Sequence, residues 1–494
     1  MSNAIKILMP IVFFAIMIYI GMRSRKRANS VNNFVLGGRN VGGWLTAFSY
    51  GTAYFSAVIL VGYSGQFGWR FGLASSWIGI GNAVIGSLLA WLFLARRTRT
   101  MTQHLGSRTM PDFFEKRYKS GSLKIGSALI IFVFLLPYSA SLYNGLSRLF
   151  GMAFNINYIW CIVIMTVFTA AYVIAGGYMA TMITDFIQGL IMLVGIVLVI
   201  IASLSQFGGL GEAYSALSKV GEAGEFTSLF GPDALSLFFV VILTSLGTWS
   251  LPQMTQKFYA IKDNAAIKKG TIISTVFALI IAGGCYFLGG FGRLLDVDVN
   301  ALGYDAIIPK MFESFSPALI GLVVIMVLAA SMSTLSSLVL TASSTITLDL
   351  IKEKICTKME EKRQVLTIRL LIAAFIILSA AIAIVQVKYK VSFIAQFMGL
   401  SWGAMAGAFL GPFLWGLYSK RVSVAAVWSS FLFAIGFMLF NLFCKSMLPA
   451  WLQSPIAAGA MVMLVSLVLV PLVSLFTRKP NKEQVAQVFA CFDK

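Results

Sequence analysis

The chain has 494 residues, of which 59% are hydrophobic and 11% are charged, and it carries a formal net charge of +20. Its many apolar runs of roughly 20 residues exclude a soluble globule and predict an all-α polytopic membrane protein. The basic residues are scattered among short loops, which argues against nucleic acid as a partner.

The apolar runs predict about thirteen transmembrane helices. No hydrophilic segment between them is long enough for a separate soluble domain, so the function is expected to reside in the helix bundle. The expected spans are 5–22, 41–68, 72–95, 122–150, 156–175, 181–204, 235–257, 271–292, 317–347, 365–386, 391–418, 423–445 and 455–477.

The basic residues predict the side of the membrane that each terminus takes. Arg23, Arg25 and Lys26 follow the first span, and alternation from that loop places most Lys and Arg residues on the same side. The positive-inside rule makes that side cytoplasmic, with the N-terminus outside and the C-terminus inside. Lys257 is counted with the cytoplasmic loop at 257–269, so no basic residue is expected at mid-depth of a core span. The compact length and short tails suggest a bacterial inner membrane.

Small polar residues interrupt the second span, within Ser49–Ala57. A discontinuous membrane helix frees backbone carbonyls to bind a cation and half-helix N-termini to meet an anionic group. Gly42, Gly43, Gly51 and Gly62 are expected to make such unwinding inexpensive. The alternative is ordinary close packing of small residues between helices.

Asp185 is the clearest acidic residue inside a predicted span, whereas nearly every other acid belongs to a loop or tail. A carboxylate in a membrane is costly to bury and usually functional. It would complete a cation site together with serines of the ninth span. The alternative is a helix N-terminal acid favoured by the helix dipole, with Thr181 as the N-cap.

The ninth span carries a cluster of hydroxyl side chains. A helix supplies oxygens from positions i, i+3 and i+4 on one face, and a hard cation such as Na⁺ needs several of them. Ser333, Ser336 and Ser337 have this spacing, as do Ala330, Ser333 and Thr334. The alternative is close helix packing, with hydroxyls bonded back to carbonyls of their own helix.

The sequence lacks two features that common classes of enzyme and pump require. His104 is the single histidine of the chain, which argues against serine–histidine hydrolysis and against a multi-histidine metal centre. The sequence also lacks a Walker-type phosphate loop, so ATP-driven pumping is unsupported. The chain is expected not to be an enzyme, to need no organic cofactor, and to draw any transport work from an ion gradient.

Motifs along most of the chain resemble the sodium:solute symporter family, which includes bacterial proline, pantothenate, sialic acid and sodium/galactose transporters. Together they are specific. They are Leu36-Gly37-Gly38-Arg39, Gly176-Gly177-Tyr178 followed by Thr184-Asp185 and Gln188, Ala330 to Leu350, Ser401-Trp402-Gly403-Ala404, Gly411-Pro412 and Lys420-Arg421.

The resemblance implies a LeuT-like fold with two inverted five-helix repeats, a broken helix in span two, and substrate and ion sites near the repeat interface. Residues 1–494 would form a single transporter domain. Its expected parts are an extra N-terminal helix at 5–22, a first repeat at 41–204, a second repeat at 235–418, two extra C-terminal helices at 423–477 and a cytoplasmic tail at 478–494.

The resemblance also implies one or two coupling sodium ions. The widely shared site would use the backbone carbonyls of Thr52, Phe55 and Ala330 and the hydroxyls of Ser333 and Thr334. Some family members hold a second ion nearer the cytoplasm, and the matching positions are Asp185, Ser333, Ser336 and Ser337.

The residues that line the solute pocket vary between branches of the family. The candidates lie on spans two, three, four and seven: Ser56, Ala57, Tyr63, Gln66, Asn82, Tyr138, Ser139, Ser141, Thr248, Trp249 and Gln253. The run Tyr138-Ser139-Ala140-Ser141, with Arg148-Leu149-Phe150, is most similar to the proline branch. That branch has an aspartate where this chain has Tyr54.

The implied function is Na⁺-coupled symport of a small organic solute, such as an amino acid or a monocarboxylate, into the cell by alternating access. The implied partners are the solute, sodium and the lipid bilayer, with no obligate protein partner. Two alternatives stay open: sodium-coupled uptake of a sugar or sialic acid, and a passive channel or solute sensor built on a transporter scaffold.

Overall fold

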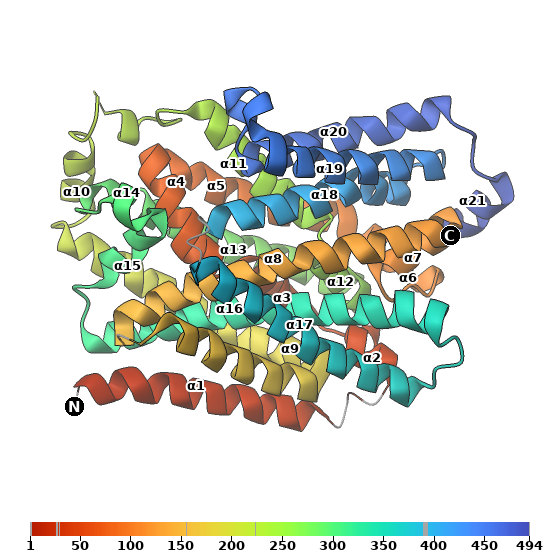
Figure 1. Cartoon of the computed structure of the whole chain (residues 1–494), viewed down its shortest axis with the longest axis horizontal. Coiled ribbons are helices and arrows are strands. Elements are labelled where there is room, and N and C mark those ends of the chain that lie inside the picture. Colours follow the sequence, from red (N-terminus) through yellow and green to blue (C-terminus); the bar gives the residue numbers. More distant parts are fainter. Residues whose placement is uncertain are drawn as a thin grey trace.

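The protein is an all-helical bundle in the computed structural model, which describes residues 2–25, 28, 30–154, 156–222, 224–388 and 394–493. Within these residues no strand forms, and the β-type pairing is limited to one isolated bridge between Val41 and Ile261. The long helices run side by side along the longest axis of the molecule (Figure 1). The predicted fold class is therefore confirmed.

The long helices follow the apolar runs of the sequence. They are α1 (Ser2–Ser24), α8 (Gly121–Phe154), α9 (Tyr158–Gln206), α13 (Asn264–Gly289), α16 (Pro317–Thr345), α17 (Glu361–Lys388), α18 (Ile394–Tyr418), α19 (Val424–Cys444) and α20 (Pro455–Phe476). Shorter helices include α2 (Val31–Leu36), α3 (Gly43–Tyr54), α4 (Ser64–Phe71), α5 (Ser76–Gly81), α6 (Arg96–His104), α7 (Met110–Tyr118), α10 (Leu210–Leu217), α11 (Ala234–Leu246), α12 (Pro252–Ala260), α14 (Val299–Leu302), α15 (Ile307–Phe312) and α21 (Lys482–Phe489).

Eleven helical stretches among the described residues are long and apolar enough to cross a membrane. Two of them, Val58–His104 and Tyr158–Gln206, join segments that belong to neighbouring predicted spans. The count of thirteen therefore stays a prediction. The predicted start of span eleven, at 391, lies outside the described residues.

Large apolar side chains cover the outer faces of the bundle. Ile201 of α9 is 61% exposed, Leu370 of α17 is 63% exposed and Leu432 of α19 is 64% exposed. Soluble proteins rarely expose continuous apolar faces of this kind, whereas a bilayer covers them without penalty. The outer surface therefore fits the membrane environment that the composition predicts.

Helix α16 forms the centre of the bundle. Every residue from Val323 to Thr345 is buried, as expected for a helix that is apolar or weakly polar on all sides. It packs against α1, α3, α8, α9 and α17. Its hydroxyl cluster is therefore enclosed by protein rather than by lipid.

The second predicted span is broken, as expected, but not at a glycine. Helix α3 ends at Tyr54, Phe55 is extended (φ −86°, ψ 102°), and a π-helical segment resumes at Val58. Gly51 stays helical, and a Cβ atom there would lie 2.4 Å from the ring of Phe277. This glycine permits close helix packing, and the chain unwinds after it.

One further interruption, in predicted span seven, was not predicted. Helices α11 and α12 are separated by a 3₁₀ turn at Gly247–Trp249 and two non-helical residues, and Pro252 then opens α12. Proline suits this first position because its missing N–H has no partner there in any case. Another interruption lies in α9 between the predicted spans 156–175 and 181–204, where Gly177 adopts a non-helical conformation with φ 59° and ψ −153°.

The two ends of the bundle carry different connections (Figure 1). The start of α1 lies at the end that also holds α10, α14 and α15, whereas α2, α6, α7 and α21 lie at the other end. The termini are thus on opposite ends of the long axis. Which end faces the cytoplasm stays a prediction.

Candidate functional site

Four buried oxygen atoms meet where α3 ends against α16. The carbonyl of Thr52 is one of the last carbonyls of α3, so the helix supplies it with no amide partner. Its oxygen lies 3.0 Å from Oγ of Ser333 and 3.1 Å from Oγ1 of Thr334. The same two hydroxyls lie 3.1 and 3.0 Å from the carbonyl oxygen of Ala330.

These four contacts exceed what two hydroxyls can donate. Ser333 and Thr334 carry one O–H proton each, whereas four short oxygen–oxygen distances connect them to the carbonyls of Thr52 and Ala330. The two surplus contacts are at best weaker, bifurcated bonds in a buried site. A small cation coordinated by the same oxygens would satisfy all of them, which is the chemistry expected of a Na⁺ ligand set.

Phe55 lies beside this cluster. It is buried at the break, and it lines a cavity of about 10 Å³ together with Ser56, Ala330 and apolar residues. That volume is close to the space one water molecule needs. The structure therefore gathers four of the five residues predicted for the first sodium site around shared oxygens, and it puts Phe55 at the adjoining cavity.

Asp185 lies in α9, two turns beyond the interruption at Gly177, and it is completely buried. Thr181 does not cap a helix, because its hydroxyl donates back to the carbonyl of Gly177 at 3.1 Å. The interpretation of Asp185 as a helix N-terminal acid is therefore wrong. Ser49 of α3 donates a hydrogen bond to Oδ2 of Asp185. The other carboxylate oxygen of Asp185, Oδ1, has no hydrogen-bond partner among the described residues.

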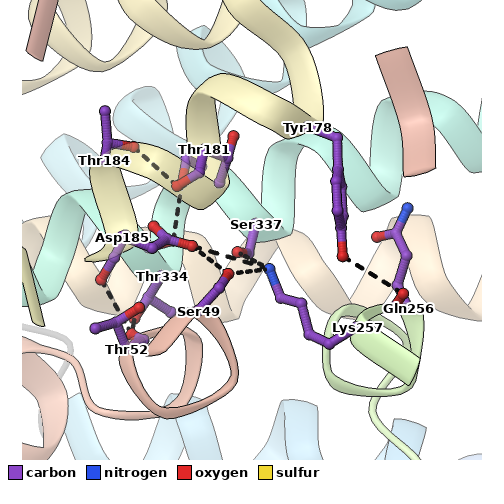
Figure 2. A network of polar contacts seen from close by, with 12 residues as sticks. Ser49, Thr52, Tyr178, Thr181, Thr184, Asp185, Gln256, Lys257, Thr334 and Ser337 are labelled. Carbon is purple, nitrogen blue, oxygen red and sulfur yellow. Dashed lines mark hydrogen bonds and ion pairs between the residues drawn. The ribbon is translucent and has the colours of Figure 1, made fainter. Parts of the chain in front are cut away.

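Lys257 is buried beside Asp185, which contradicts its expected place in a cytoplasmic loop. It belongs to α12, and its side chain is only 2% exposed. The ammonium nitrogen lies 2.7 Å from Oγ of Ser49, 3.1 Å from Oγ of Ser337 and 3.9 Å from Oδ2 of Asp185 (Figure 2). The error arose because the break in span seven was not recognised, so the polar turn of α12 was assigned to a loop.

Polar contacts around Lys257 fasten α12 to three other helices. Gln256 donates from Nε2 to the carbonyl of Val35 at 3.0 Å, and its Oε1 accepts from Thr341 at 2.9 Å. The hydroxyl of Tyr178 lies 3.5 Å from the backbone carbonyl of Gln256 (Figure 2). Because these bonds tie α2, α9 and α16 to α12, the ammonium of Lys257 is held in position.

The four residues predicted for a second sodium ion do not all face one point. Ser337 faces the ammonium of Lys257, as does Asp185. The hydroxyl of Ser336 donates to the carbonyl of Ser333 at 2.9 Å, and the hydroxyl of Ser333 bonds to the first oxygen cluster. A basic side chain thus shares this position with the predicted ligands.

Five of the predicted solute residues make hydrogen bonds within the protein: Ser56, Asn82, Ser141, Thr248 and Trp249. The bonds of Asn82, Thr248 and Trp249 connect different helices, whereas those of Ser56 and Ser141 stay within one segment. Thr248, for example, donates to the carbonyl of Gly86 at 2.8 Å, and Trp249 donates to the carbonyl of Ile85 at 2.8 Å. These side chains hold the site in shape.

Of the six remaining candidate solute residues, three are described by their packing or exposure and three by buried polar atoms that lack a partner. Ala57 packs against Gly145, Tyr63 stacks edge-on against Phe67, and Gln66 is half-buried. The other three carry buried polar atoms that lack a hydrogen-bond partner among the described residues: Tyr138, Ser139 and Gln253. Buried polar atoms are normally paired, so these three are the better candidates for contact with a solute, together with Asn82, whose amide nitrogen is also without a partner among the described residues.

Trp402 of α18 lies beside the broken helices, although the sequence did not place it among the solute candidates. Its ring centroid lies 5.5 Å from that of Tyr54 and 5.9 Å from that of Tyr138. The indole N–H and both tyrosine hydroxyls are buried and form no hydrogen bond of normal geometry in the described part of the chain, although Trp402 is a polar neighbour of the Tyr138 hydroxyl and Thr244 is one of the Tyr54 hydroxyl. A Cβ atom on Gly247 would lie 2.7 Å from the indole, so the ring contacts both broken helices. The available signal was a tryptophan directly before the small-residue run Gly403–Gly407 of this helix.

A charged cluster gathers at the end of the bundle that holds α7. Lys124 of α8 is 4% exposed, and its ammonium lies 2.7 Å from Glu115 and 3.7 Å from both Asp112 and Asp349. It also pairs with Glu353. A cavity of about 280 Å³ adjoins these residues. The cluster joins α7, α8 and the segment that continues α16.

Comparison with known proteins gives consistent results. The chain is 31% identical to the osmoregulated proline transporter OpuE of Bacillus subtilis (strain 168) over 421 residues, which covers 83% of each protein. It is 29% identical to the sodium/proline symporter 2 of Staphylococcus saprophyticus over 427 residues, covering 84% of this chain and 82% of the relative.

A solved structure of another transporter has the same fold as this chain. The structure of a Na⁺-coupled sialic acid symporter in a substrate-bound outward-open state matches with a TM-score of 0.75 and 17% sequence identity. The match covers 97% of this chain and 99% of the other. A model of the sodium:solute symporter family matches residues 34–432. The chain therefore belongs to the sodium:solute symporter family and is a membrane transporter, not an enzyme.

Proposed function

We propose that the chain carries a small organic solute into the cell together with Na⁺, and that this ion binds between α3 and α16. The observation that carries the proposal is the buried oxygen cluster of Thr52, Ala330, Ser333 and Thr334. Its two carbonyls and two hydroxyls match the oxygen ligands that a hard cation requires. Sodium is cargo here, bound and released in each cycle.

Coupling between Na⁺ binding and solute binding follows from the helices that supply the four oxygens of the cluster. Thr52 belongs to the broken helix, whereas Ser333 and Thr334 belong to the central helix α16. An ion that bridges the two helices stabilises the arrangement in which the break, and hence the solute site beside it, is ordered. Ion and solute then raise each other's affinity by the same factor. The membrane potential supplies about 2.3 kcal/mol per charge per 100 mV.

The proposed solute is a small amino acid or monocarboxylate, with proline as the first compound to test. Two relatives are named as proline transporters. The residues proposed to contact the solute are Tyr54, Tyr138 and Trp402, which offer two hydroxyls, one indole N–H and aromatic faces. Neutral donors of this kind can bind a carboxylate, while the rings pack against a compact apolar body.

Uptake by purified protein in liposomes tests the proposal. An inward sodium gradient is imposed, and labelled proline, other amino acids, monocarboxylates, sialic acid and hexoses are supplied in turn. We expect saturable, sodium-dependent uptake of one compound class, and we expect the double variant S333A/T334A to lose it. Ser343→Ala is the matched control, because Ser343 lies in α16, is buried and has no hydrogen-bond partner in the described structure. Non-saturable uptake that ignores sodium would indicate a passive channel instead.

A further inference from the structure

We propose that the ammonium group of Lys257 serves as a tethered cation in the position predicted for a second sodium ion. The solute would then be coupled to a single Na⁺, bound at the oxygen cluster of Thr52 and Ala330. This inference rests on the proposed function, because it concerns how many ions accompany the solute. It assigns to Lys257 the role that a free ion would otherwise fill.

The contacts of Lys257 are those of a bound cation. An ammonium group has three N–H donors. Two of its oxygen neighbours are hydroxyls, at 2.7 Å for Ser49 and 3.1 Å for Ser337, and the third is the carboxylate of Asp185 at 3.9 Å. The ring of Tyr178 lies 5.3 Å from the nitrogen and adds the attraction of an aromatic face. The charge is thus enclosed by oxygens and a π system.

The same contacts compete with a sodium ion. Asp185 and Ser337 are half of the predicted ligand set for a second ion, and both face Lys257. Of the other two, Ser336 bonds to a backbone carbonyl and Ser333 belongs to the first site. A sodium ion at this position would add a second positive charge beside a single buried carboxylate. Like charges at such short range repel strongly in a buried site.

Charge balance also explains why Asp185 is tolerated. A buried carboxylate without a partner is strongly unfavourable, and Asp185 is completely buried. In a site filled by sodium, the neutralising charge would leave with the ion in each cycle. Lys257 stays attached to α12, so Asp185 keeps a counter-charge after Na⁺ and solute have left. The empty carrier can then return without exposing an unpaired carboxylate.

The tethered charge links three helices that carry the sodium and solute sites. Ser49 lies on α3 one turn before Thr52, Ser337 lies on α16 one turn after Ser333, and Lys257 lies on α12 beyond the break in span seven. Figure 2 shows the ammonium between the side chains of Ser49, Asp185 and Ser337. A second ion would make a similar bridge only while bound.

The first experiment measures coupling in the wild-type protein and needs no variant. Proteoliposomes are given opposing gradients of sodium and of the transported solute, and the membrane potential at which net solute flux stops gives the number of sodium ions per solute. We expect one ion per solute. A value of two would overturn the inference while leaving sodium symport intact. A flux that ignores the sodium gradient would instead refute the proposed function.

The second experiment asks whether the lysine fills a cation position. Binding of radioactive sodium is measured on purified Lys257→Met, which keeps the aliphatic stem but removes the charge. We expect this variant to bind a second sodium ion, and the double variant D185N/K257M to lose that ion again. Lys262→Met is the matched control, because Lys262 lies five residues further along and is 48% exposed. A folded K257M that binds only one ion would overturn the inference.

Discussion

Removing either member of the buried pair Asp185 and Lys257 should destabilise the protein, and removing both should cost clearly less than the two single losses added together. Asp185→Asn leaves a buried ammonium without a counter-charge, and Lys257→Met leaves a buried carboxylate. Breaking a buried pair from one side costs about 3–5 kcal/mol, because an uncompensated charge remains in a medium of low dielectric constant. The double variant D185N/K257M contains neither charge.

The distance between the two groups sets the expected size of the coupling. Lys257 Nζ and Asp185 Oδ2 are 3.9 Å apart. At an effective dielectric constant of about 20, two unit charges at that distance attract by about 4 kcal/mol. A double-mutant cycle on the free energy of unfolding, measured in mixed detergent micelles, should therefore give a coupling energy of about 2–4 kcal/mol.

The exposed pair Lys262 and Asp263 provides the control for this cycle. Its ammonium and carboxylate are 3.6 Å apart, but the side chains are 48% and 47% exposed. Water and salt screen such pairs, so a cycle on these residues should give no measurable coupling. The reasoning would be refuted if the effects of D185N and K257M simply added, within about 0.5 kcal/mol.

Three further predictions concern the ion site, the solute site and the charged cluster. Ser333→Ala or Thr334→Ala should raise the sodium concentration for half-maximal uptake by roughly tenfold to a hundredfold, because a polar contact to a charge is worth about 1.5–3 kcal/mol. Ser343→Ala should leave that concentration unchanged, and an equal effect would disqualify the oxygen cluster. Trp402→Phe keeps a ring but removes the indole N–H, so the solute KM should rise about tenfold. An unchanged KM would remove Trp402 from the solute site. Lys124→Met leaves four carboxylates without their shared buried cation, so hydrogen exchange should speed up in α7. Unaltered exchange there would show that Lys124 does not hold this end together.

The sequence predicted the membrane fold and singled out four residues that the structure gathers in one oxygen cluster. Ser333 and Thr334 stood out because hydroxyls are unusual in a helix that is otherwise apolar, and polar residues in span two indicated a break. The exact point of unwinding was not predictable from glycine content. Gly51 is needed for close contact with Phe277, and the chain unwinds only at Phe55. The carbonyl of Thr52, which the end of α3 leaves without an amide partner, then contacts α16. Packing, rather than local flexibility, decides where this helix ends.

Lys257 was missed because its role depends on tertiary structure. A lysine near the end of an apolar run normally belongs to a membrane boundary, and the positive-inside rule treats it that way. Its partner Asp185 is 72 residues earlier in the chain, on a helix bent at Gly177. One local signal was available, since Pro252 followed by a run of amides and a hydroxyl suggests a helix that restarts within the span. The pairing itself required the structure.

The position of Trp402 has a consequence for the order of events in transport. Its indole ring lies against Tyr54, where α3 stops, and carbons of the same ring lie close to Gly247, where the next broken helix turns. The break after α3 and the break between α11 and α12 therefore both contact the ring of Trp402, and we expect them not to move independently. A displacement of the ring by one broken helix would therefore press directly on the other. Opening at one end of the bundle and closing at the other can thus be synchronised by a single side chain, without a long relay of contacts.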